Sequence, residues 1–313
     1  MAKLTWIKNV KRSSNTAVTV GTFDGVHLGH RTLIKRLVDK AKESNSRSVL
    51  VSFDPHPREV LQGGHNSIKL LTTLQERAEI LNSLGVDELV VIPFDRDFSL
   101  MSSEDFIQKV IYQKIGVKHF IIGYDHQFGK NREGTISTVK RLGDMLGFDV
   151  HMVEAHEVAH ITVSSTTVRK ALSEEGNVEM AAAFLGRPYQ LAGMVVHGDK
   201  KGREIGYPTA NIRVTNERKI IPAYGVYAVQ VEYEGKLYGG MLNIGMRPTV
   251  TDSKELRIEV NIFDFSEMIY GKQLKVFFHK RIRDEVRFSS LSALKEQLAT
   301  DKQDCISVLK TVY

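Results

Sequence analysis

The first half of the chain alternates apolar runs with amphipathic stretches. Four runs are short, continuous and rich in β-branched residues, as strands buried on both faces require: 18–20, 49–51, 89–92 and 120–122. Three intervening stretches carry apolar residues three and four positions apart, the spacing of one helix face: 28–43, 74–84 and 103–115. This order predicts an α/β domain with a parallel, doubly wound sheet.

The pattern changes after Gly186-Arg187-Pro188. From there, apolar and polar residues alternate in runs bounded by glycines, which predicts an antiparallel barrel or a sandwich. The runs are 226–233, 239–244, 258–263 and 274–278, and a helical stretch follows at 291–309. We therefore predict two domains, residues 1–185 and 186–313.

Length and composition agree with this division. The chain has 313 residues, more than the roughly 250 to 300 that one core usually supports. No segment approaches the roughly 20 apolar residues of a membrane span, and residues 1–11 do not resemble a signal peptide. The single cysteine, Cys305, cannot form an intrachain disulfide. We expect a soluble cytoplasmic protein without a membrane partner. The net charge of +6 indicates affinity for anions, without saying which.

The first segment with candidate chemistry is GTFDGVHLGH at residues 21–30, between the first strand and the first helix. Glycines let the backbone approach a ligand, and a helix amino terminus attracts phosphate. His27 and His30 are three residues apart and would share one face of the first turn. Neither a G-x-x-x-x-G-K-[ST] loop nor a G-x-G-x-x-G fingerprint is present. A metal pair or a chance surface pair is the alternative, which the strand-loop-helix context disfavours.

This segment resembles the H-x-G-H signature of the nucleotidylyltransferase superfamily, in the long form typical of bacterial FAD synthetases. Three later segments resemble further motifs of that family in order: FDPHP at 53–57, IGYD with FG at 122–129, and VSSTTVR at 163–169. Two departures are His126-Gln127, where a more aromatic pair is usual, and Val163 in place of Ile. The resemblance implies a Rossmann-like domain in which the FMN phosphate attacks the α-phosphorus of ATP, giving FAD and pyrophosphate.

The resemblance also implies roles for individual residues. His27 and His30 would stabilise phosphate charge as catalytic residues. Asp54 would contact the flavin, although for Asp54 and His56 a turn fixed by Pro55 and Pro57 is an equal alternative. The implied nucleotide-binding residues are Gly21, Phe23, Asp24, His27, His30, Asp125, Ser164, Ser165, Thr166 and Arg169.

A literal H-E-x-x-H match occurs at residues 156–160. On a helix it would supply two zinc ligands and a general base. However, it follows the strand-like stretch 148–153 and continues into the β-branched residues 161–163, which are poor helix material. We reject a metalloprotease.

The second candidate segment is GDKKGREIGYPTAN at residues 198–211. Such glycine- and lysine-rich stretches are often only solvated turns. Here, strand alternation would turn Thr209 and Asn211 to the same side, and their two oxygens suit Mg²⁺ bound with ATP. Mn²⁺ or Zn²⁺ is the alternative ion.

This segment resembles the G-R-x-x-G-x-P-T-A-N signature of riboflavin kinases without a gap. The resemblance implies an antiparallel Greek-key β-barrel with a C-terminal helix, which phosphorylates riboflavin to FMN. By this resemblance, Glu259 stands at the position of the glutamate that acts in the family as base for the ribityl hydroxyl. Asn261 stands where the family usually has His. Arg281 and Arg287, with Arg283, would bind flavin or ATP phosphates or form a basic helix cap. The implied ATP-binding residues are Gly198, Lys200, Gly206, Pro208, Thr209 and Asn211, of which Thr209 and Asn211 would hold the metal.

Together the two motif sets indicate a bifunctional enzyme that uses riboflavin, FMN and ATP. One alternative is an FAD synthetase whose barrel only binds flavin, and the reverse is a kinase with a decayed first domain. The intact motifs oppose both. A nucleic-acid-binding protein would also fit the charge, but no recognition motif is present and the basic residues are scattered. Channelling between the sites, flavin redox preference, product inhibition and oligomeric state stay open.

Overall fold

The structure is a computed structural model that describes residues 2–61, 68–124, 127–130, 133–154, 163–198, 201–248 and 254–311. The chain divides into two compact units, Met1–Ser165 and Thr166–Tyr313. Within the described ranges, no helix is long and apolar enough to cross a membrane.

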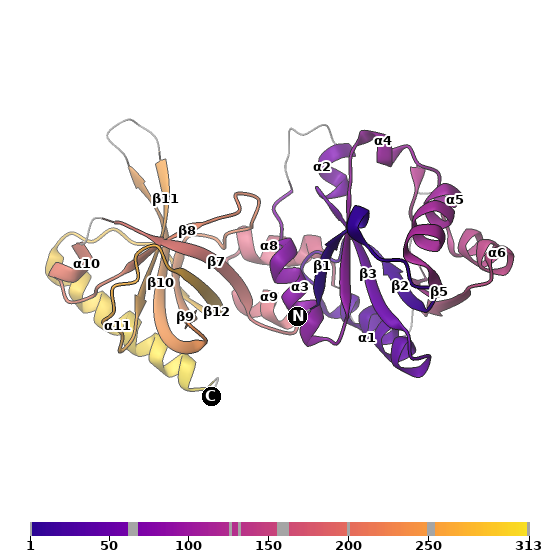
Figure 1. Cartoon of the computed structure of the whole chain (residues 1–313). Helices are drawn as coiled ribbons and strands as arrows, with labels where there is room; N and C mark the ends of the chain where they lie inside the picture. Colours follow the sequence, from indigo (N-terminus) through magenta and orange to yellow (C-terminus); the bar gives the residue numbers. More distant parts are fainter. Residues whose placement is uncertain are drawn as a thin grey trace. The chain divides into compact units, whose positions relative to one another are not determined.

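The first unit is built on a parallel six-stranded sheet (Figure 1). Its strands lie in the order β1-β4-β3-β2-β5-β6. They are β1 (Lys3–Trp6), β2 (Thr16–Val20), β3 (Arg47–Asp54), β4 (Glu88–Pro93), β5 (Val117–Gly123) and β6 (Asp149–Val153). This confirms the predicted parallel sheet, and all four predicted strands are present. The chain leaves β2 toward β3 on one side and returns at β5 on the other, so β2 and β5 flank the topological switch point.

Helices cover both faces of the sheet. One face packs on α1 (Leu28–Glu43) and α3 (Leu74–Ser83), and the other on η2 (Phe106–Ile115) and α6 (Ile136–Leu146). Short helices complete the unit: η1 (Ile7–Asn9), α2 (Pro57–Leu61), α4 (Arg96–Ser99) and α5 (Ser103–Asp105). Thr73 and Glu76 form a capping box that begins α3, which satisfies two backbone donors.

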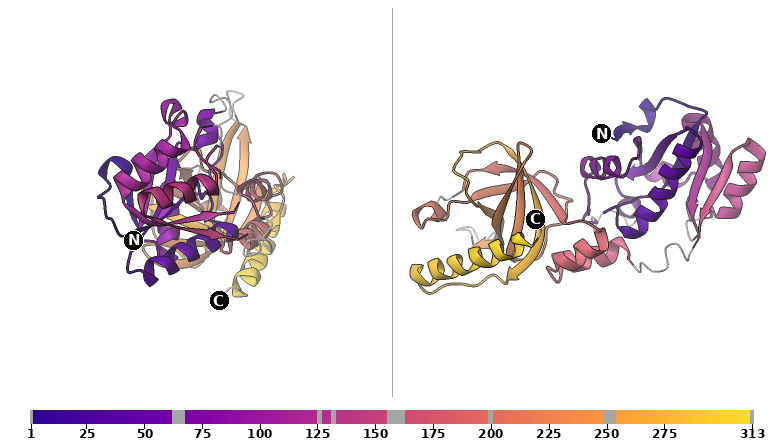
Figure 2. Two further views of the ribbon diagram at one scale, coloured as in Figure 1. Left: turned by 90° about the vertical axis from the view of Figure 1, so that its right-hand side faces the viewer. Right: turned by 90° about the horizontal axis from the view of Figure 1, so that it is seen from below.

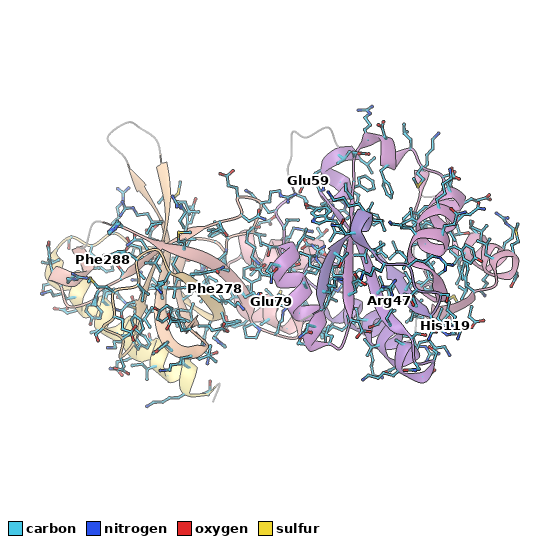
Figure 3. The ribbon with its side chains drawn as sticks, viewed as in Figure 1. Arg47, Glu59, Glu79, His119, Phe278 and Phe288 are labelled. Atoms are coloured by element: carbon cyan, nitrogen blue, oxygen red, sulfur yellow. The ribbon has the colours of Figure 1, made fainter. Side chains whose placement is uncertain are left out.

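The second unit is a closed antiparallel barrel. Of the two architectures that the sequence pattern predicted, the barrel is therefore correct and the sandwich is not. Its strands follow one another as β10-β11-β8-β7-β12-β9. They are β7 (Tyr189–Val196), β8 (Ala210–Val214), β9 (Gly225–Tyr233), β10 (Lys236–Pro248), β11 (Lys254–Ile262) and β12 (Gln273–Arg283). Because β12 returns beside β9 after the β9-β10-β11 meander, these four strands form the predicted Greek key. Tyr189, Tyr227 and Phe278 are fully buried, and the rings of both tyrosines contact Phe278. Phe278 is labelled in Figure 3.

The predicted C-terminal helix is α11 (Leu291–Lys310), which lies along the outside of the barrel (Figures 1 and 2). Its apolar residues Cys305 and Leu309 pack on Val226 and Met241 of the barrel. Burial raises the pKa of the Cys305 thiol to about 12, so this thiol is inert at neutral pH.

Three further helices belong to the second unit: α8 (Ser165–Ser173), α9 (Val178–Leu185) and α10 (Lys201–Glu204). The backbone N–H of Ala223 donates to the carbonyl of Leu172, and Lys280 lies 4.0 Å from Glu179. These contacts attach α8 and α9 to the barrel, and the division by contacts falls after Ser165, the first residue of α8.

Candidate active sites

The loop of residues 21–27 lies at the switch point of the parallel sheet. It begins where β2 ends and leads into α1. A cavity of about 310 Å³ opens there. Its lining comes from this loop, from the first turns of α1 and from the ends of β2, β5 and β6: Val20, Gly21, Thr22, Phe23, His27, Gly29, His30, Leu33, Gly123, Tyr124, Val153 and Val163. Open α/β sheets bind ligands at this position.

His27 and His30 lie together at the amino terminus of α1. His27 is the N-cap residue, and its Nδ1 accepts a hydrogen bond from the backbone N–H of His30 at 3.4 Å. The two rings stack with centroids 3.6 Å apart. The Nδ1 atom of His30 is buried without a hydrogen-bond partner among the described residues. Burial, then the charges of His27 and Arg77, lower the pKa of His30 well below its ordinary value. At neutral pH His30 is therefore an uncharged ring that can donate one N–H.

Asp24 belongs to this loop, and its side chain is fully buried. Its carboxylate accepts hydrogen bonds from the backbone N–H of Leu71 at 3.0 Å and of Thr72 at 2.9 Å. Arg77 of α3 lies 3.5 Å away and is also buried, and it donates to the hydroxyl of Ser52 on β3 at 2.8 Å. A buried charge is tolerated only when it is paired and hydrogen-bonded, and this network meets both conditions. It ties the loop to two neighbouring elements.

The loop backbone is strained where it turns. Phe23 and Val26 have φ of 47° and 44°, in the left-handed region that non-glycine residues rarely adopt. Gly25 between them has φ of 85°, and its N–H donates to the Thr72 hydroxyl at 3.0 Å. Strain of this kind persists only where the surrounding structure enforces it. The bonds to residues 71 and 72 supply that enforcement.

The last motif of the first domain reaches the same loop through Ser165. Its hydroxyl donates to the carbonyl of Asp24 at 2.9 Å, and Val163 lines the cavity. Ser164 precedes α8, while Thr166 and Arg169 lie within it. The predicted flavin contact Asp54 is the last residue of β3. Asp125, His126 and the H-E-x-x-H segment lie outside the described residues.

The barrel carries a second cavity, of about 290 Å³, on its outer side. Strand residues form one wall, α11 and the segment before it form another, and the loop before β8 closes it. The lining residues are Gly202, Ile205, Tyr207, Thr209, Val226, Met241, Asn243, Glu259, Asn261, Arg283, Glu285, Val286, Phe288, Leu294 and Leu298. Phe288 is labelled in Figure 3. Two of the residues predicted to carry chemistry, Thr209 and Glu259, therefore face one space.

Glu259 lies in the middle of this wall. In the barrel it pairs with Asn243 of β10 on one side and with Asn211 of β8 on the other. Its carboxylate is 3.6 Å from Arg257 and 30% exposed, so it stays accessible to a substrate. Asn261 is buried and donates from its amide nitrogen to the carbonyl of Pro208 at 2.7 Å. This residue, which replaces the family's usual His, therefore fastens the loop of residues 202–209 to β11.

The predicted metal ligands lie against glycines. A Cβ at Gly198 would overlap the side-chain amide of Asn211, and one at Gly202 would contact the Thr209 hydroxyl at 3.4 Å. Glycine at 198 therefore lets the backbone approach the Asn211 side chain closely, and glycine at 202 does the same for the carbonyl of Tyr207, which a Cβ would overlap. Gly206 has φ of +87°, a conformation suited to glycine. Lys200 lies outside the described residues.

Arg283 is one of the three predicted arginines, and it lines the cavity. Arg281 instead donates to the carbonyl of Tyr224 and pairs with Asp284 at 2.7 Å. Arg287 is exposed, and neither is among the described residues that line the cavity. Arg283 is held by Asp301 of α11, with Nη2 to Oδ2 at 2.8 Å. Asp301 is fully buried, so this ion pair fixes α11 beside the site.

Sequence reasoning missed the residues that support these sites. Arg77, Thr72 and Ser52 lie under the first loop, and Asp301 supports the second cavity. An arginine on an amphipathic helix is usually solvent-exposed, so nothing local marked Arg77. Only the pairing of elements far apart in the sequence buries it.

The fold and the two cavities define a class: a two-unit enzyme with a nucleotidylyltransferase-type α/β unit and a kinase-type barrel. Comparison with known proteins agrees. The FAD synthetase family matches residues 9–167, and the riboflavin kinase family matches residues 185–309. The chain belongs to the family of bifunctional riboflavin kinase/FMN adenylyltransferases.

Curated relatives with that name cover nearly the whole chain. The relative from Buchnera aphidicola subsp. Schizaphis graminum is 42% identical over 94% of this chain and 95% of its own. The relative from Listeria monocytogenes is 39% identical over 93% and 91%. A crystal structure described as a macrolide-efflux protein from Streptococcus pneumoniae is 34% identical, covers 96% of this chain and 97% of its own, and has a TM-score of 0.86. The full-length match shows that the whole two-unit architecture is shared.

Proposed function

We propose that the α/β unit transfers the adenylyl group of ATP to FMN, giving FAD and pyrophosphate, and that the barrel phosphorylates riboflavin to FMN. The observation that carries the proposal is that each unit has one cavity lined by the predicted reactive side chains. These are His27 and His30 in the first unit and Glu259 with Thr209 in the second. Family membership supplies the substrates.

In the adenylyl transfer, an FMN phosphate oxygen attacks the α-phosphorus of ATP in line, and the bond to the β-phosphate oxygen breaks. Charge then builds up on the departing pyrophosphate. His27 and His30, together with the amino terminus of α1, would stabilise that charge with N–H donors. An uncharged His30 binds phosphate by donation and becomes a stronger donor as the phosphates raise its pKa.

The other predicted residues of this site divide into two groups. Gly21 and Phe23 would contact the nucleotide from the loop, and Ser164, Ser165, Thr166 and Arg169 would do so from the start of α8. Asp125 would contact nucleotide or metal, and Asp54 the flavin. Asp24 would act by positioning, because its carboxylate is already bonded to residues 71, 72 and 77.

In the kinase reaction, the ribityl 5′-hydroxyl attacks the γ-phosphorus of ATP. Glu259 would orient this hydroxyl and accept its proton. Gly198, Lys200, Gly206 and Pro208 would bind the ATP phosphates along the glycine-rich loop. Arg283 joins Arg281 and Arg287 as a candidate for contacts with flavin or phosphate, since it lines the cavity.

Mg²⁺ is the metal we propose for the kinase site. Thr209 and Asn211 offer a hydroxyl and an amide oxygen, the hard ligands that this ion takes while leaving positions for phosphates and water. The position of Thr209 in the lining of the same cavity as Glu259 supports the fit. When bound, Mg²⁺ would neutralise phosphate charge, and the residues of the cavity would still orient the hydroxyl.

The predictions for the domain boundary, the location and the partners are unchanged. We place the functional boundary near residue 186, since the two family matches end at 167 and begin at 185. Helices α8 and α9 fill the interval. The cytoplasmic location and the absence of a nucleic-acid partner stay predictions from composition, and the oligomeric state stays open.

The test is chromatography of flavins after incubating the purified chain with ATP and Mg²⁺. Riboflavin should give FMN and then FAD, and added FMN should give FAD. FMN without FAD would overturn the assignment of the first unit, and FAD formed only from FMN would overturn that of the barrel. Omitting Mg²⁺ in the presence of a chelator should stop FMN formation.

A further inference from the structure

Two histidines and an aspartate meet at the edge of the parallel sheet, away from both cavities. β5 and β6 pair in parallel, with His119 opposite Asp149 and Ile121 opposite His151. Because alternate strand residues share a face, His119, Asp149 and His151 all project from the face that α1 covers. β6 is the edge strand, so one side of the group is open to water. His119 is labelled in Figure 3.

The three side chains direct ligand atoms at one another. His119 Nδ1 lies 3.1 Å from Asp149 Oδ2 and 3.3 Å from His151 Nε2. All three ligand atoms fall within 4.8 Å of one another. Tetrahedral zinc, with bonds of about 2.0–2.1 Å, places its ligand atoms about 3.3 Å apart. Two of the three separations, 3.1 Å and 3.3 Å, are already close to this value, and the Asp149 side chain, 67% exposed, can move to adjust the third.

A hydrogen-bonded cluster explains these contacts less completely. His119 Nδ1 can carry one proton, yet it faces both the Asp149 carboxylate, which can only accept, and a His151 ring nitrogen whose role depends on its tautomer. Its other nitrogen, Nε2, is buried without a partner among the described residues. One ring nitrogen of His119 is therefore unsatisfied in either tautomer. Placing the proton on Nε2 frees the Nδ1 lone pair for a metal and costs no additional partner.

The charges around the cluster favour neutral rings. Burial is the largest cause that lowers the pKa of His119 and of His151. The charge of Lys40 on α1 acts in the same direction on both, whereas Asp149 opposes it. Lys118 also acts on His119 and Arg36 on His151. Neutral imidazole is the form that binds metal, although these cations also weaken the attraction of a dication.

We propose that His119, His151 and Asp149 bind one divalent transition-metal ion of the zinc type, with water completing the coordination. Two imidazoles and one carboxylate form a donor set for such ions rather than for Mg²⁺. His119 lies near the start of β5, whereas the flavin-site cavity touches the end of that strand at Gly123. The ion would pin the edge strand β6 to β5 and would take no part in either transfer.

The experiment is titration of the metal-free full-length chain with Co²⁺ and with Zn²⁺, without nucleotide. We expect one Co²⁺ per chain, with visible absorption bands of low-coordinate cobalt that Zn²⁺ abolishes by displacement. When the free Zn²⁺ concentration is a hundred times the Kd, the midpoint temperature for unfolding of the first unit should rise by about 5 °C. Absence of binding would overturn the proposal.

Variants separate this site from other histidines. Asp149→Asn and His151→Ala should lose the cobalt bands and the thermal shift, yet retain FAD formation from FMN, which also reports that they fold. The exposed position of Asp149 makes its variant the safer of the two. His30→Asn is the matched control and should keep the bands. If the bands survive both Asp149→Asn and His151→Ala, or vanish with His30→Asn, the metal is bound elsewhere and the proposal fails.

Discussion

The candidate site of the α/β unit lies in a loop, whereas that of the barrel lies on strands. In the first unit, His27 and His30 stand at a helix amino terminus, the end of a helix that carries a partial positive charge. In the second, Glu259 and its neighbours Asn211 and Asn243 come from paired strands whose backbone groups already bond to one another. Each fold thus offers phosphate a different kind of partner.

The two sites differ in the charge that they present to a phosphate. A helix terminus and neutral imidazoles bind phosphate oxygens directly, because both are donors. The barrel cavity instead presents the carboxylate of Glu259, which would repel a phosphate, beside the Thr209 hydroxyl, which can either accept or donate. In the kinase site that we propose, a Mg²⁺ ion held by Thr209 and Asn211 would separate the phosphates of ATP from this carboxylate.

Glu259→Gln gives the largest expected effect. It removes the base but keeps the shape, so FMN formation from riboflavin should fall by about 10²- to 10⁴-fold, whereas FAD formation from added FMN should be unchanged. Timed chromatography of both reactions measures this. Glu232→Gln, on β9 and 3.8 Å from Lys275, is the matched control with both activities intact. If Glu259→Gln slowed both reactions in folded protein, the two sites would not be independent.

His30→Ala should produce the reciprocal result. Losing one preorganised donor should slow FAD formation by about 10²- to 10³-fold, and riboflavin should then be converted to FMN that accumulates. The barrel activity of the same protein serves as the internal control for folding. An equal loss of FMN formation would contradict the separation of the two sites.

Each unit also contains a buried carboxylate that is paired with an arginine. Asp24 and Arg77 are both buried, so Asp24→Asn leaves a charge without its counterion and should cost about 3 kcal/mol of stability. We expect the first unit to unfold at a lower temperature and FAD formation to decline, while FMN formation persists below that temperature. Calorimetry with parallel assays measures both.

Asp301→Ala is the matched variant in the barrel. Arg283 keeps 20% of its side chain exposed, so water screens its charge and the cost should be smaller, about 2 kcal/mol. Here FMN formation should decline and FAD formation from FMN should persist. Asp304→Ala, an exposed position on the same helix, should change neither. If Asp24→Asn and Asp301→Ala impaired the same reaction, each pair would not serve its own site.

Much of the fold could be predicted, because apolar runs and helical spacing are local properties. The stretch predicted as a helix over residues 28–43 is α1 with the same limits. By contrast, β1 has a single buried residue, Thr5, and too little apolar sequence to mark it. Helix α9 also went unpredicted.

Site residues that belong to a sequence motif could be predicted. Those whose side-chain direction depends on the strand register could not. Arg281 and Arg283 would share a face of a regular strand, since they are two residues apart. In β12 the register shifts between them, so a bulge separates their directions and brings Arg283 to the cavity. The sequence does not reveal where a bulge falls. Arg77 and Asp301 depend on tertiary pairing in the same way.

The smallest predicted effect concerns pH and the His30 ring. Its pKa is lowered in the folded chain by burial, His27 and Arg77, but is about 6.5 in the unfolded chain. Above pH 6.5 neither state is protonated there, and no penalty exists. As the pH falls below 6.5, the unfolded state takes up a proton that the folded state resists, so stability decreases by at most about 1.4 kcal/mol per pH unit.

Urea unfolding of the first unit at pH 7.5 and 5.5 measures this loss in the parent chain and in His30→Asn. His119 and His151 of the same unit, whose pKa values are also lowered by burial, contribute equally to both proteins and cancel in the difference. The variant should therefore lose less stability than the parent on acidification. An equal loss would mean that His30 is not held neutral, and the charge contrast between the two sites would then weaken, because a protonated His30 would bind phosphate as a cation.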